Sequence, residues 1–134
     1  MASIRREVSI AVAPEQAWSA LRDVGALHTR LVVGFVTDCR LDGDARSVTF
    51  ANGVTARERI VDVDDAARRV VWSAVGGRLS HHNASAQVFD DAGGSRVVWI
   101  ADLLPNELAP AIAAMIEQGL AAMRRTLESA AGDA

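Results

Sequence analysis

Apolar and polar residues alternate in short runs along most of the chain, and this period of two predicts strands with one buried face. The first run, residues 8–12, ends at Pro14. Proline suits the first turn of a helix and Glu15 places a negative charge near its amino end, so residues 14–21 are predicted to form a short helix. A second short helical segment is expected at 25–31.

Turn-forming residues then recur at short intervals between runs rich in valine, threonine, isoleucine and aromatic residues. Asn52-Gly53 is the clearest turn, because both residues tolerate the positive φ of a tight hairpin. Strands joined by such turns are expected to form an antiparallel meander. The six predicted strands cover residues 32–41, 46–51, 54–63, 69–75, 83–89 and 96–104.

The carboxyl end carries apolar residues at spacings of three and four, which predict one amphipathic helix over residues 107–130. Pro105 ends the last strand, and Asn106 is suited to cap the helix. Gly119 lies on the apolar side of this helix, which indicates that another group approaches the backbone closely there. Residues 130–134 are expected to be a short frayed tail.

An antiparallel sheet of seven strands covered by one long helix defines an α+β fold class. A helix is about 10 Å across, so it cannot fill the whole face of such a sheet. The pattern therefore predicts a cavity between the sheet and the helix.

Composition narrows the class of protein. The net charge is −3 and arginines occur at most in pairs, so no nucleic-acid partner is expected. No run approaches the roughly 18 apolar residues of a membrane span, so membrane insertion is not expected either. Cys39 is the single cysteine and the three histidines lack zinc-site spacing, which predicts a cytoplasmic protein without a metal or other cofactor. The length predicts one domain over 1–134, with its core at about 3–129, as a monomer or homodimer.

Several stretches support a family resemblance. They are Pro14 to Trp18, Arg57 to Ile60 with Asp64-Asp65, Gly76-Gly77 with His82-Asn83, and Trp99 to Pro105. With the order of elements, they resemble the START-like or Bet v 1-like (SRPBCC) superfamily, and within it the bacterial polyketide cyclase/dehydrase-like proteins. The resemblance implies the helix-grip fold: a seven-stranded curved sheet around a long C-terminal helix, with two short helices after the first strand. It also implies a small hydrophobic ligand, while the superfamily's functions are diverse.

The segment 57–65 is also similar to plant abscisic-acid receptors, in which a glutamate faces the ligand cavity. Glu58 occupies the place of that glutamate. The gate segment of those receptors is replaced here by residues 50–53, so a gated receptor mechanism is not expected.

Strand parity selects candidate polar groups for the cavity. On the strand 54–63, the face without arginines contains Glu58. On the sixth of the seven strands, His82 shares a face with Ala84, Ala86 and Val88. Both faces of the strand 96–104 are apolar, so parity does not choose between them; the resemblance favours the face with Ile100 and Asp102. Asp102 would then lie within hydrogen-bonding reach of His82.

Each polar candidate has a simpler alternative. Glu58 can instead face outward and pair with Arg57 or Arg59, and His82 and Asp102 can be rim groups satisfied by backbone or water. The apolar wall is expected to include Val54, Ala56, Ile60, Trp72, Ala84, Ala86, Ile100, Met115, Ile116, Gly119 and Met123. Trp72 also fits an ordinary core position.

Three hypotheses for function follow. The first is a binding protein for a lipid-like, aromatic or polyketide-like molecule, whose polar end Glu58, His82 and Asp102 orient. The second is a cofactor-independent polyketide cyclase or dehydratase, in which His82 or Glu58 acts as general base and Asp102 orients the imidazole. The third is a protein–protein interaction module, which predicts a large exposed apolar patch and no internal void.

Overall fold

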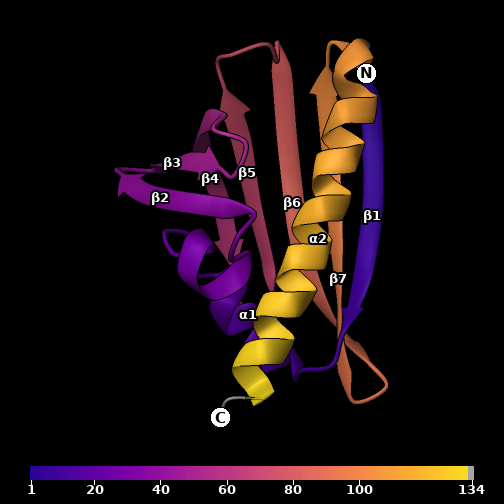
Figure 1. The fold of residues 1–134 in the computed structure, drawn as a ribbon. Helices are drawn as coiled ribbons and strands as arrows, with labels where there is room; N and C mark the ends of the chain where they lie inside the picture. The colour runs from indigo at the N-terminus through magenta and orange to yellow at the C-terminus, as the bar shows by residue number, and fades with distance from the viewer. Residues whose placement is uncertain (133–134) are drawn as a thin grey trace.

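The computed structural model describes residues 1–132 and contains a seven-stranded sheet in the order β1-β7-β6-β5-β4-β3-β2, with antiparallel neighbours throughout. The strands are β1 (Ala2–Ile10), β2 (Val36–Asp42), β3 (Ala45–Phe50), β4 (Thr55–Asp64), β5 (Arg69–Val75), β6 (His81–Asp91) and β7 (Gly94–Leu104). The helical elements are α1 (Pro14–Leu21), the π-helical turn η1 (Leu27–Leu31), the 3-10 turn η2 (Asn106–Leu108) and α2 (Ala109–Gly132). Figure 1 shows α2 running diagonally across one face of the sheet, with its carboxyl end near α1. The helix-grip fold implied by the family resemblance is confirmed.

The element bounds agree closely with the sequence pattern at α1 and β5 and shift elsewhere. β1 begins at Ala2, because Ile4 continues the inward alternation toward the amino end. β2 begins only at Val36, since Gly34 adopts a φ of +85° and turns the chain before it. The expected frayed tail is helical as far as Gly132, and its last two residues lie outside the described part of the chain.

α1 is held against the sheet by both burial and a hydrogen bond. Ala17, Trp18 and Leu21 are buried, as the spacing predicts. The indole Nε1 of Trp18 donates a hydrogen bond of 2.9 Å to Asp65, which lies just beyond the end of β4. This contact ties α1 to the segment between β4 and β5. Within residues 1–132, no helix is both long enough and apolar enough to cross a membrane.

The orientation of β7 differs from the one that the resemblance favoured. Trp99 and Ala101 face the interior, whereas Ile100 is 37% exposed on the opposite face. Both faces of β7 are apolar, so the choice depends on packing against α2, where Gly119 leaves room for the Trp99 ring. The expectation that Ile100 and Asp102 share the inner face is therefore wrong.

Val54 also lies elsewhere than expected. It precedes β4 in the turn from β3 and is 56% exposed, so it does not form part of an interior wall. The turn keeps the chain near the surface at this point, and inward alternation on β4 begins with Ala56, which pairs with the buried Val48.

Candidate functional site

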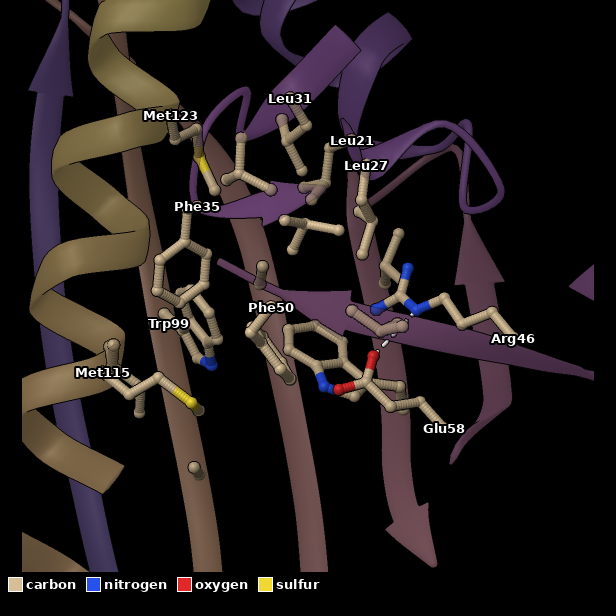
Figure 2. A pocket seen from close by; sticks show the side chains of 18 of the residues that line it. Leu21, Leu27, Leu31, Phe35, Arg46, Phe50, Glu58, Trp99, Met115 and Met123 are labelled. Carbon is tan, nitrogen blue, oxygen red and sulfur yellow. Dashed lines mark hydrogen bonds and ion pairs between the residues drawn. The ribbon is translucent and has the colours of Figure 1, made fainter. Parts of the chain in front are cut away.

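A cavity of about 60 Å³ lies between the sheet and α2. Its wall is mainly apolar, and Figure 2 shows Met115 and Met123 of α2 on one side and Arg46 and Glu58 on the other. A cavity needs only about 10–15 Å³ to admit a water molecule, whereas small-molecule pockets usually measure about 300–1,000 Å³. The space can therefore admit water, but a molecule of more than a few atoms requires the side chains around it to move.

Four aromatic rings occupy the centre of this region. Phe35 and Phe50 meet edge to face with centroids 5.4 Å apart, and Trp72 and Trp99 do so at 5.6 Å. All four line the cavity. Phe35 and Phe50 were not expected there. Phe35 belongs to the predicted strand 32–41 but lies in the loop before β2, and Phe50 ends β3.

Gly119 explains how the Trp99 ring fits beneath α2. A Cβ atom at this position would lie 2.8 Å from the Trp99 ring and 3.3 Å from Phe35. A separation of 2.8 Å is too short for a carbon–carbon contact, so glycine allows the ring to pack against the helix backbone. The close approach predicted from the position of Gly119 is confirmed.

One polar corner, formed by Arg46, Glu58 and His82, interrupts the apolar wall. Arg46 Nε donates a hydrogen bond of 2.8 Å to Glu58 Oε1, and both side chains are buried. Arg46 Nη1 donates a second bond of 3.1 Å to the carbonyl of Val24, and its guanidinium lies over the Trp72 ring at 5.4 Å. Figure 2 shows the pair at the edge of the cavity. The two opposite charges are thus compensated locally inside the protein.

Glu58 faces inward, as parity predicts, and the alternative of an outward ion pair is wrong. Arg57 instead pairs with Asp42 at 3.0 Å, and Arg59 lies 3.9 Å from Asp44. Arg46 is a charged site residue that the sequence pattern did not identify. It lies directly opposite Glu58 in the β3–β4 ladder.

His82 lies where β5 and β6 are no longer paired. The paired register of β5 and β6 ends at Trp72 and Ala84. Beyond this point the backbone N–H of Ala74 donates to Nδ1 of His82 at 2.9 Å, and the Ser73 hydroxyl donates to the His82 carbonyl. His82 therefore lines the cavity while its side chain replaces a missing ladder hydrogen bond.

Burial favours the neutral form of His82, and the hydrogen bond from Ala74 decides which ring nitrogen carries the proton. Burial lowers the pKa of the imidazole, while the nearby Glu58 carboxylate raises it and His81 lowers it. Because Nδ1 accepts from a backbone amide, the neutral ring carries its proton on Nε2. His82 thus presents a hydrogen-bond donor, and its basic nitrogen is already occupied.

Asp102 does not join this corner. In the β6–β7 register it pairs with Asn83, whereas His82 pairs with Leu103. Directly paired residues project to the same face, so Asp102 and His82 lie on opposite faces of the sheet. The expected His82–Asp102 hydrogen bond is wrong.

The predicted wall residues divide into three groups. Those that line the cavity are Trp72, Ala86, Met115, Ile116 and Met123. Ala56, Ile60, Ala84 and Gly119 lie on inner faces without lining the cavity, and Val54 and Ile100 are exposed.

A family model for polyketide cyclase/dehydrase and lipid transport proteins matches residues 1–128. The chain belongs to this family. A search of the curated proteins found no match to the chain.

Solved structures support the fold of this polyketide cyclase/dehydrase and lipid transport family member. XoxI from Bacillus cereus is 22% identical, with a TM-score of 0.82 and coverage of 95% of this chain and 96% of that one. The di-domain ARO/CYC BexL from the BE-7585A biosynthetic pathway is 15% identical, with a TM-score of 0.81 over 96% of this chain and 47% of its own. Ara h 8.0201 is 14% identical, with a TM-score of 0.75 and coverage of 96% and 98%. At these identities the similarity establishes the fold alone.

The burial of His82 predicts that stability depends on pH. Because burial lowers the folded-state pKa below its ordinary value of 6.5, the unfolded chain binds the proton more readily. The contribution is complete above about pH 6.5 and is lost as the pH falls toward the folded-state pKa. Urea unfolding between about pH 7.5 and about pH 5.5 should show this decline.

His82→Asn is the matched control for this prediction, because its Oδ1 can accept the Ala74 N–H without titrating. The variant should show a flatter dependence over the same range. Exposed carboxyl groups with lowered pKa, such as Glu7 and Asp65, lose their contribution only at lower pH. An equal slope in both proteins would exclude His82 as the source.

Proposed function

We propose that this protein binds a small hydrophobic molecule in the cavity between the sheet and α2, with a polar group of the molecule directed at Arg46, Glu58 and His82. The observation that carries the proposal is an apolar cavity with a single polar corner that keeps unused hydrogen-bonding capacity. Glu58 Oε1 accepts from Arg46, and among the described residues Oε2 makes no hydrogen bond. Among residues 1–132, the Nε2 proton of His82 likewise has no hydrogen-bond partner.

The wall suits a ligand larger than the present space. Met115 and Met123 have flexible, polarisable side chains that adapt to irregular shapes. Phe35 lies in the loop before β2, where Gly34 has a positive φ, so its ring is attached to backbone outside the sheet ladder. Movement of these three side chains would enlarge the cavity without disturbing the sheet.

The contacts favour holding a ligand over acid/base turnover. Asp102 is on the far face, the Nδ1 lone pair of His82 is engaged, and Glu58 is paired with Arg46. A cyclase or dehydratase reaction would need one of these groups released in the bound state. The interaction-module hypothesis expects a filled interior, which the cavity argues against.

We also propose that the protein is cytoplasmic and is a monomer or a homodimer. Its partner is then a small molecule and not a nucleic acid. Cys39 is buried and free, so it suits a compartment that keeps thiols reduced.

The experiment is a thermal-shift and native mass-spectrometry titration with phenol and naphthol, two neutral aromatic probes of different size. Wild-type protein should be stabilised and should bind one probe molecule per chain. Ala86→Ile adds a larger side chain inside the cavity and should abolish binding. Asn83→Ile places the same new side chain on the opposite face of β6 and should leave binding unchanged.

Absence of binding by both probes to the wild-type protein would contradict the proposed function. Equal loss of binding in the Ala86 and Asn83 variants would place the probe outside this cavity.

A further inference from the structure

The charges of the polar corner add up to zero. Arg46 contributes one positive charge, Glu58 one negative charge, and His82 is neutral because its Nδ1 accepts a backbone hydrogen bond. Both members of the ion pair are buried, with side-chain exposures of 4% and 11%, so water screens them weakly. The positive charge at this site is therefore already matched within the protein.

A ligand carboxylate would upset this balance. Arg46 already donates to Glu58 at 2.8 Å and to the Val24 carbonyl at 3.1 Å. A second carboxylate would have to share one guanidinium with Glu58, leaving an uncompensated negative charge in an apolar cavity. Desolvating a charge without a partner is strongly unfavourable.

A neutral hydroxyl group meets no such cost. It can donate to the free Oε2 of Glu58, and it can accept from the Nε2 proton of His82. Hydrogen bonds to a charged acceptor are stronger than bonds between neutral groups, so the Glu58 carboxylate favours a ligand that donates.

Taking the proposed function as given, we infer that the cavity selects neutral ligands that carry a hydroxyl or similar donor group and rejects carboxylates, and that Glu58 sets this selectivity. Fatty acids and other anionic amphiphiles are then excluded, whereas phenols and alcohols are accepted. Removing the Glu58 charge should free Arg46 to pair with an anionic ligand instead.

The test uses three naphthalene probes substituted at the same ring carbon: naphthol, naphthamide and naphthoate. Naphthamide matches naphthoate in shape and can donate a hydrogen bond but carries no charge. At about pH 7.5, wild-type protein should bind naphthol and naphthamide, and naphthoate at least about 100-fold more weakly. The measurement is isothermal titration calorimetry supported by thermal shifts.

The Glu58→Gln variant is titrated with the same probes as the second part of the test. Glutamine retains a carbonyl that can accept from Arg46 but removes the negative charge. Naphthoate should now bind, should stabilise the variant more than naphthamide does, and should show affinity that falls with added salt. Arg46→Gln combined with Glu58→Gln removes both charges and should lose this gain.

The outcomes separate the two proposals. If none of the probes binds wild-type protein, the proposed function fails. If naphthoate binds wild-type protein as well as naphthamide does, ligand binding stands and the selectivity is overturned. If naphthol binds but naphthamide and naphthoate both fail, size and not charge decides, which also overturns it. If Glu58→Gln is poorly folded, the wild-type comparison alone decides.

Discussion

Replacing Arg46 with methionine should lower the free energy of unfolding by about 3–5 kcal/mol, because it leaves a buried carboxylate without its partner. The Glu58 side chain has 11% of its surface exposed, so solvent cannot replace the lost hydrogen bond of 2.8 Å. The Val24 carbonyl also loses a donor. Urea unfolding followed by circular dichroism measures the change, which is a large part of the roughly 5–15 kcal/mol typical of a whole domain.

Two variants control for this interpretation. Arg57→Met breaks an exposed ion pair between β4 and Asp42 at the end of β2, and should cost less than about 1 kcal/mol. Arg46→Met combined with Glu58→Leu removes both charges and should recover most of the stability, because no buried charge remains. A cost for Arg46→Met as small as that for Arg57→Met would mean that the pair is solvated in solution.

The position of Arg46 also shows why part of the site could not be predicted. A two-residue turn at Asn52-Gly53 pairs residue 51 with residue 54, and that register places Arg46 opposite Arg59. The structure instead pairs Thr49 with Thr55, so the loop holds one residue more and Arg46 lies opposite Glu58. A shift of one residue changes which side chains meet, and the sequence pattern does not distinguish the two loop lengths.

The inward-facing side of a strand could be predicted where one face alone is apolar, but not where both faces are apolar. β4 places arginines on one face only, so the inward direction of Glu58 followed from parity. β7 is apolar on both faces, and its orientation depends on how Trp99 fits against Gly119 of α2, a contact between distant parts of the chain. The same dependence on tertiary packing explains why Asp102 was assigned to the wrong face.

The hydrogen bond from the Ala74 amide to His82 could not be predicted for a related reason. His82 was identified from parity, but its role depends on the early end of the β5–β6 ladder after Trp72 and Ala84. The unpaired Ala74 amide is what occupies Nδ1. The sequence pattern does not show where two strands separate, so the difference between a base and a donor was visible only in the structure.

Trp72→Ala should lower the free energy of unfolding by about 3–5 kcal/mol and enlarge the cavity. The Trp72 side chain is 6% exposed, packs edge to face on Trp99 at 5.6 Å and lies beneath Arg46 at 5.4 Å. Its removal takes away buried apolar surface, an aromatic pair and a cation–π contact together. Thermal and urea unfolding measure the loss.

Added indole distinguishes a cavity from general disorder in this variant. Indole has the shape of the deleted ring, so it should raise the melting temperature of Trp72→Ala more than that of wild-type protein. Trp72→Phe keeps an aromatic ring against Trp99 and should cost less stability and respond less to indole. A Trp72→Ala protein that loses stability but gains nothing from indole would have collapsed around the site, because a preserved wall of Phe50, Trp99 and Met115 would still accept the ring. The difference in indole stabilisation between Trp72→Ala and wild-type protein therefore measures whether the wall of the cavity keeps its shape when the Trp72 ring is removed.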